Sequence, residues 1–199
     1  MDNHFGLEVF DSYSMFKNQY MCDKMIIETN LSVVYEVIDT EGDRNRRYAL
    51  KVIPIDIYKR ICDKLSLSFA ISHSNIITTF TVLFDSDSNP KFAAYLMELG
   101  YGDLITLQDQ IIGSEIAVKK IIYDSLKGLK YLHEYHICHL NIKPENIIAK
   151  SYQEPRTYAI CDFSCAMQNE DDIFNGPFRG TPIYSAPEKM NNCQCMYIL

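Results

Sequence analysis

Apolar and polar residues alternate along much of the first half of the chain. Segments 33–37 and 48–53 combine β-branched and aromatic residues with this alternation, which favours strands. Two further apolar runs, 76–83 and 91–97, flank a polar turn at 85–90. This arrangement predicts a second pair of antiparallel strands. The first half of the chain is therefore expected to be rich in β-structure.

The pattern changes to a helical period in the segment 114–133. Its apolar residues recur at spacings of four, three and three, which is one face of a helix: Ile122, Leu126, Leu129 and Leu132. Ser114 is a candidate N-cap, because its hydroxyl can accept from the first unbonded N–H groups. Short apolar runs at 147–148 and 158–161 then predict another hairpin.

Composition limits the classes of partner and the cellular setting. The chain has 199 residues, 47% of them hydrophobic, which is enough for a substantial core. Its net charge of −7 argues against nucleic acid or an anionic membrane as a partner. Seven cysteines without a secretory signal predict reduced thiols and a cytoplasmic, intracellular location. Residues 1–19 have no clear period and are expected to form an N-terminal extension.

Candidate chemistry is concentrated in a few short motifs. The sequence H-L-N-I-K-P-E-N occupies 139–146, and D-F-S follows at 162–164. This pair resembles the H-R-D-x-K-x-x-N and D-F-G loops of eukaryotic protein kinases. Lys51 within a predicted strand and G-T-P-I-Y-S-A-P-E at 180–188 resemble two further motifs of the same family. The four motifs occur in the family order, so the resemblance extends over most of the chain.

The resemblance implies an α+β, protein-kinase-like two-lobe fold. A β-rich N-lobe would cover about 20–98, and a mainly helical C-lobe about 99–199, within one kinase-like domain of residues 20–199. After Glu188 only eleven residues remain, whereas the family continues with several helices. The C-lobe is therefore expected to be truncated. The apolar face of the 114–133 helix would then lack its usual cover.

The family binds ATP with Mg²⁺, and the resemblance assigns roles to several residues here. Lys51 would contact the α- and β-phosphates. Asp162 would hold Mg²⁺, and Asn146 would hold a second ion. Lys143 would neutralise charge on the transferred phosphoryl group. The adenine pocket would be formed by side chains of Val34, Ala49, Met97 and Ile148 and by main-chain groups of Glu98 and Leu99.

The position of the family's catalytic base is occupied by Asn141. A carboxamide is neutral and its oxygen is a very weak base, so it cannot accept the substrate hydroxyl proton near pH 7. The glycine loop is also lost, because Ile27, Thr29 and Ser32 stand at its three glycine positions. Glycine lets the backbone approach the phosphates and offer N–H groups. Phosphate binding by this hairpin is expected to be weak.

Other departures concern the supports of the site. A helix within 54–72 would carry the family's glutamate partner of Lys51, but Lys64 falls at that position and Asp63 is one residue away. Leu140 replaces the arginine that receives an activation-loop phosphate. Ser164 replaces the glycine of D-F-G, which restricts the backbone.

The sequence favours a pseudokinase of the serine/threonine family, with weak ATP and Mg²⁺ binding and an unidentified protein partner. Two alternatives stay open. One is a low-activity ATP-dependent serine/threonine kinase, because phosphoryl transfer depends mainly on positioning. The other is a non-functional truncated fragment. Neither nucleic acid nor a membrane is expected as a partner.

Overall fold

A computed structural model describes most of the chain. The described residues are 19–41, 46–168 and 179–187. Nearly all of the predicted N-terminal extension, Glu188 and the last eleven residues lie outside them. Within the described ranges, no helix is both long and apolar enough to cross a membrane.

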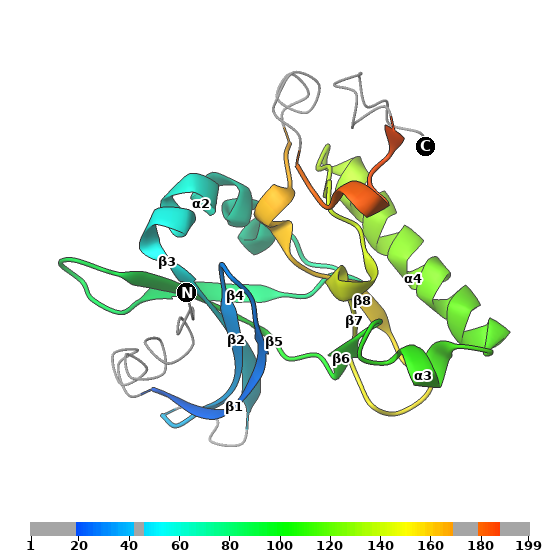
Figure 1. Ribbon diagram of the computed structural model, residues 1–199, viewed down its shortest axis with the longest axis horizontal. Helices are drawn as coiled ribbons and strands as arrows, with labels where there is room; N and C mark the ends of the chain where they lie inside the picture. Colours follow the sequence, from blue (N-terminus) through cyan, green and yellow to red (C-terminus); the bar gives the residue numbers. More distant parts are fainter. Residues whose placement is uncertain (1–18, 42–45, 169–178, 188–199) are drawn as a thin grey trace. The chain divides into compact units, whose positions relative to one another are not determined.

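The chain divides into two compact units (Figure 1). The first contains the chain up to Asp63 together with Thr78–Leu99. The second contains Lys64–Ile77 and the chain from Gly100 onward. Helix α2, Ile55–Ala70, contributes residues to both units, because the boundary falls between Asp63 and Lys64.

The first unit is built on a five-stranded antiparallel sheet with the order β1-β2-β3-β5-β4. Its strands are β1 Tyr20–Glu28, β2 Val33–Asp39, β3 Arg47–Pro54, β4 Thr79–Phe84 and β5 Phe92–Glu98. The predicted strands are confirmed, with one correction: β4 begins at Thr79, not at Ile76. Ile76 and Ile77 belong to the second unit, where Ile77 N–H donates to the Ile160 carbonyl at 2.9 Å.

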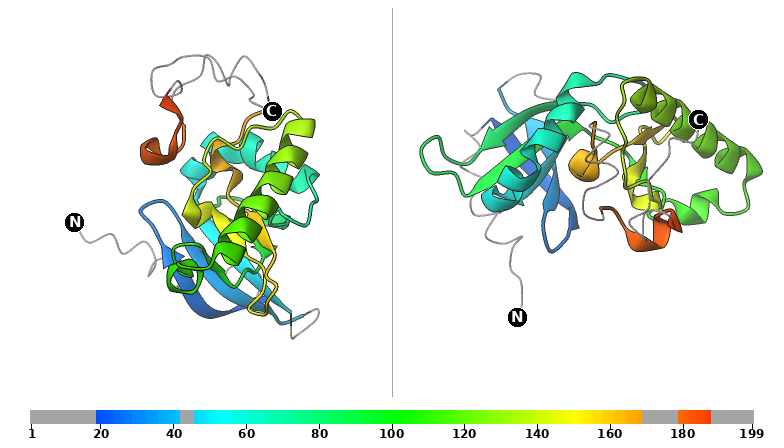
Figure 2. Two further views of the ribbon diagram at one scale, coloured as in Figure 1. Left: turned by 90° about the vertical axis from the view of Figure 1, so that its right-hand side faces the viewer. Right: turned by 90° about the horizontal axis from the view of Figure 1, so that it is seen from above.

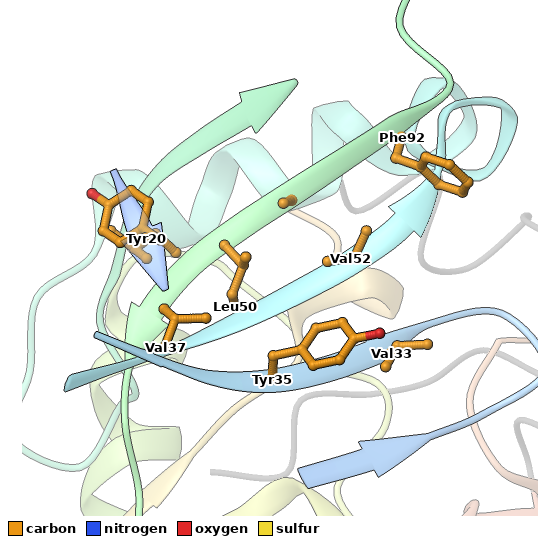
Figure 3. Packing of buried hydrophobic residues seen from close by; sticks show 9 residues of the cluster. Tyr20, Val33, Tyr35, Val37, Leu50, Val52 and Phe92 are labelled. Carbon is orange, nitrogen blue, oxygen red and sulfur yellow. The ribbon is translucent and has the colours of Figure 1, made fainter. Parts of the chain in front are cut away.

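One face of this sheet carries the core of the first unit. Alternate residues of β2 and β3, namely Val33, Tyr35, Val37, Leu50 and Val52, are buried together (Figure 3). Tyr20, Phe92, Ala94 and Leu96 complete the cluster. Burial of each aliphatic side chain stabilises the fold by about 1.5–3 kcal/mol. The intervening residues of the same strands, including Lys51, point to the opposite face of the sheet.

The second unit combines a long helix with a small sheet. The sheet has the order β6-β7-β8, with β6 Gly102–Asp103, β7 Ile147–Ala149 and β8 Tyr158–Ile160. Helices α3, Gln108–Ile111, and α4, Glu115–Glu134, precede β7. Helix α4 lies beside β8, as the second view in Figure 2 shows. The hairpin predicted for 147–161 is confirmed by the antiparallel pairing of β7 and β8.

Helix α4 begins as the sequence predicts but packs through a different face. Ala117 N–H donates to Ser114 Oγ at 3.2 Å, which confirms the N-cap. Leu132 is buried, but Ile122 and Leu126 are 53% and 58% exposed. The packing face is centred on Gly128, where an added Cβ would lie 2.7 Å from the Asn75 carbonyl oxygen. Close approach at this glycine decides which side of the helix is buried.

Candidate active site

The loop that carries the candidate catalytic residues is anchored by His139. This side chain is buried, and its ring packs edge-on against Phe163 with centroids 5.2 Å apart. Asn141 N–H donates to His139 Nδ1 at 3.3 Å, so Nδ1 is the acceptor and Nε2 carries the proton. His139 Nε2 then donates to the Cys161 carbonyl at 2.9 Å. One imidazole therefore joins the two catalytic motifs.

Phe163 belongs to a buried apolar cluster of the second unit. The cluster consists of Ile71, Ile76, Leu132, Ile137, Phe163 and Ala166, with Leu67 and Tyr131 packed against it. It joins the end of α2, the core of α4 and the D-F-S segment. His139 packs against this cluster through its ring contact with Phe163.

Asn141 is held by hydrogen bonds on its main chain and on its side chain. Its carbonyl accepts from Asn146 Nδ2 at 2.8 Å, and its N–H bonds to His139. Thr181 Oγ1 donates to Asn141 Oδ1 at 2.9 Å. The oxygen at the position of the family's base is thus already an acceptor. Thr181 was not predicted as a site residue, although its G-T-P-I-Y context marked the segment.

Asn146 and Asp162 are brought together by the main chain. Cys161 N–H donates to the Asn146 carbonyl at 2.9 Å, which places Asn146 beside the residue that precedes Asp162. Asn146 is buried, and the bond from its Nδ2 to Asn141 leaves its Oδ1 to serve as a ligand. Both side chains offer oxygen atoms, which Mg²⁺ prefers.

Asp162 adopts a left-handed backbone with φ 65° and ψ 85°. Its Oδ1 accepts from Ser164 N–H at 3.3 Å and caps the 3₁₀ turn Phe163–Cys165. Positive φ among the described non-glycine residues occurs at His136, Leu140 and Asp162 but not at Ser164. The serine in place of glycine is therefore accommodated without left-handed strain.

The residues present fit a Mg²⁺ ion that is shared with phosphate. In the described ranges, no group of three or more His, Cys, Asp or Glu side chains could hold a metal ion. Asp162 and Asn146 supply only two protein oxygens, and Mg²⁺ at such sites completes its shell with water and substrate phosphates. Lys143 adds a positive charge, although its Nζ lies 3.8 Å from Glu145 Oε1.

The first unit places most of the predicted nucleotide residues on one face of its sheet. Val34 pairs with Lys51, and Ala49 pairs with Met97, so these four side chains share a face. It is the face opposite the hydrophobic core. Lys51 is half-buried there.

At the end of β5, one of the main-chain groups predicted to contact adenine is already hydrogen-bonded. The backbone N–H of Glu98 donates to the Thr78 carbonyl at 2.9 Å, so this amide is engaged within the unit. Leu99 is the last residue of the first unit. In the second unit, Ile148 lies in β7, where a Cβ at Gly100 would come within 2.0 Å of its Cγ2. Only glycine fits beside Ile148 at this point.

The structure therefore brings the predicted site residues together in two sets. The first unit contains Val34, Ala49, Lys51, Met97, Glu98 and Leu99, and the second contains Asn141, Lys143, Asn146, Ile148 and Asp162. Asp63 is exposed and Lys64 is half-buried on α2. The identity of the Lys51 partner and the joint action of the two sets stay predictions.

Several known proteins are similar to this chain in sequence. The family model described as "Protein kinase domain" matches residues 23–197. The serine/threonine-protein kinase DCLK1 of Rattus norvegicus is 30% identical over 193 residues, covering 91% of this chain and 42% of that protein. A probable myosin light chain kinase of Dictyostelium discoideum is 31% identical over 186 residues, covering 87% of this chain and 54% of that protein.

A third relative shows the same relation over a shorter stretch. The probable serine/threonine-protein kinase fhkB of Dictyostelium discoideum is 32% identical over 122 residues, 61% of this chain and 10% of that protein. The chain spans about half or less of the length of these relatives. The family match covers nearly the whole chain. This chain belongs to the protein kinase family.

Proposed function

We propose that this protein is a pseudokinase of the serine/threonine kinase family, which transfers little or no phosphate and acts by binding. The observation that carries this proposal is the state of Asn141. Its carboxamide has no useful basicity, and its Oδ1 already accepts a hydrogen bond from Thr181 at 2.9 Å. Loss of a general base typically costs about 10²–10⁴ in rate.

Nucleotide binding in this proposal is weak and depends on Mg²⁺. Asp162 and Asn146 would hold the ion, and Lys51 would contact the phosphates. Mg²⁺ would screen the charge of the triphosphate, while Lys143 would add a positive charge near the terminal phosphate. The hairpin that normally supplies backbone N–H groups carries Ile27, Thr29 and Ser32 instead of glycine. The retained residues support binding, and the altered hairpin supports its weakness.

A protein partner forms part of the proposal. Helix α4 exposes Ile116, Ile122 and Leu126 at 82%, 53% and 58% of their surface. These residues lie four or six positions apart, and Tyr123 beside them is 61% exposed. An apolar stripe of this kind supports association with another apolar surface. The acidic chain supports a protein partner inside the cell over nucleic acid or a membrane.

The second candidate is a low-activity serine/threonine kinase. The bond from Asn146 Nδ2 to Asn141 and the bond from Cys161 N–H to Asn146 favour it, because they hold the candidate catalytic loop in place although the base is missing. Phosphoryl transfer relies mainly on positioning and charge stabilisation, which these residues could still supply.

Binding and transfer are tested separately on the purified chain. Unfolding is followed with and without ATP and Mg²⁺, where ligand at ten times its Kd adds about 1.4 kcal/mol of stability. Lys51→Ala and Asp162→Ala should each reduce this gain. Lys119→Ala, a matched change at an exposed lysine paired with Glu115, should not.

Transfer of labelled phosphate from ATP to a serine/threonine peptide distinguishes the two candidates. The pseudokinase predicts a rate for the wild type equal to that of Asp162→Ala. A wild-type rate well above this blank would favour the low-activity kinase. Tight ATP binding without Mg²⁺ that ignores both substitutions would contradict the proposed site.

A further inference from the structure

The turn between β1 and β2 satisfies its own hydrogen bonds through one side chain. Thr29–Ser32 joins the two strands at the position where kinases carry the glycine loop. Ser32 N–H donates to Thr29 Oγ1 at 3.0 Å, and Leu31 N–H donates to the same atom at 3.3 Å. Thr29 N–H also donates to the Ser32 carbonyl at 2.8 Å. Three backbone donors of the turn are therefore used within it.

The hydroxyl of Ser32 strengthens this arrangement. Thr29 Oγ1 lies 3.0 Å from Ser32 Oγ and 3.1 Å from the Ser32 carbonyl oxygen. The Thr29 hydroxyl has one proton and two lone pairs. Its proton can bond either Ser32 oxygen, while the lone pairs face the N–H groups of Leu31 and Ser32. Two of the three residues at the glycine positions, Thr29 and Ser32, thus take part in one closed network.

The turn has no need of glycine in this form. The described non-glycine residues with positive φ lie elsewhere in the chain, at His136, Leu140 and Asp162. The turn therefore uses backbone angles that threonine and serine adopt without strain. Because it is both unstrained and internally bonded, opening it toward a phosphate would break existing bonds without relieving any strain.

The charge beside the turn also opposes phosphate. Glu28, the last residue of β1, directly precedes Thr29 and is exposed. In glycine loops the corresponding N–H groups point at phosphate oxygens, because glycine has no side chain that could accept from them. Here the threonine hydroxyl oxygen accepts from the same kind of donor, next to a carboxylate.

We propose that Thr29 Oγ1 takes the place of a phosphate oxygen, so that this site favours an adenine nucleoside over a nucleoside triphosphate. The inference rests on the proposed nucleotide site and names the class of ligand that it accepts. A phosphate oxygen can reach the N–H groups of Leu31 and Ser32 only by displacing the hydroxyl. A nucleoside has no phosphate group and therefore does not need the N–H groups of Leu31 and Ser32 as donors.

The test compares the Kd of adenosine with the Kd of ATP, with Mg²⁺ present, by calorimetry on the full chain. Thr29→Val removes the hydroxyl and keeps the shape of the side chain. It should tighten ATP binding relative to adenosine by about tenfold, since a hydrogen bond to a charged acceptor is worth about that much. The Kd of adenosine should change by less than about twofold.

Two variants control for the loss of a threonine hydroxyl in general. Thr29→Ser keeps the acceptor and should leave the ratio of the two Kd values unchanged. Thr40→Val removes a hydroxyl that donates to the Gln19 carbonyl at 2.7 Å, at the other end of the same hairpin. It should also leave the ratio unchanged. Thr29→Ala repeats the test if the valine variant does not fold.

An unchanged ratio in folded Thr29→Val or Thr29→Ala would overturn the proposal, as would failure of every variant to bind adenosine. A wild type that prefers ATP strongly over adenosine would also overturn it. The proposed function fails by a different result, namely phosphate transfer by the wild type above the blank. Binding of adenosine and of a non-hydrolysable ATP analogue is independent of transfer.

Discussion

Asn141→Asp would place a carboxylate at the position of the family's base. The main chain of this residue is held on both sides, by bonds of 3.3 Å to His139 and 2.8 Å from Asn146. These bonds do not involve the Asn141 side chain, so the new carboxylate should occupy the same place. Thr181 would then donate to a charged acceptor. This bond stabilises the ionised form and lowers the pKa of the introduced carboxyl group, which weakens it as a base.

The expected increase in the rate of phosphate transfer follows from the added base and from its bond to Thr181. A positioned base contributes about 10²–10⁴ in rate, equivalent to about 2.7–5.4 kcal/mol. A hydrogen bond to a charged group is worth about 1.5–3 kcal/mol, and part of this must be given up when the carboxylate turns to the substrate hydroxyl. If the bond from Thr181 is given up in full, the net gain in transition-state stabilisation lies between about zero and 3.9 kcal/mol, which predicts an increase of less than about 10³-fold over the wild type.

The assay is transfer of labelled phosphate from ATP to a serine/threonine peptide, with Asp162→Ala as the blank. Adding Thr181→Val to Asn141→Asp removes the competing donor and should raise the rate further. An increase above about 10³-fold from Asn141→Asp alone would refute the reasoning, because Asn141 would then be the only defect. So would a double variant no faster than the single one.

Two further predictions concern stability. Gly128→Ala should destabilise the protein by about 1–2 kcal/mol in chemical denaturation. The added Cβ would lie 2.7 Å from the Asn75 carbonyl oxygen, and this clash should outweigh the better helix propensity of alanine. Equal stability of the variant and the wild type would contradict the close packing at Gly128. Burial lowers the pKa of His73 from 6.5, and its neutral Nδ1 accepts from Asn75 N–H at 3.0 Å. The nearby charges are Lys127 and Lys150, which also lower this pKa, and Glu134, which raises it. Because the pKa of His73 is lower in the folded protein than in the unfolded chain, the neutral imidazole contributes to the free energy of unfolding. This contribution is fully present above about pH 6.5 and is lost as the pH falls below that value. His73→Asn keeps a hydrogen-bond acceptor that does not titrate. The free energy of unfolding of this variant should therefore fall less between pH 7 and pH 5 than that of the wild type. An equal fall in both proteins would exclude His73 as the cause of the pH dependence.

The local elements and the order of the motifs could be predicted from the amino-acid sequence. Alternation in β2 and β3 and the helical period after Ser114 are encoded within one element, so they could be recognised without the fold. The loop from His139 to Asn146 could also be recognised, because its residues resemble the catalytic loop of protein kinases. The same holds for Asn141, since a carboxamide is a poor base wherever it stands.

Which side chains contact one another could not be predicted in this way, because it depends on the folded arrangement of the chain. Thr181 bonds to Asn141 across 40 residues, and no pattern in either segment indicates that contact. The buried face of α4 depends on how closely Gly128 approaches the Asn75 backbone, not on the apolar period alone. Periodicity reports which side of an element can be buried. Which surface is buried, and which oxygen is already engaged, depends on neighbours that are distant in sequence.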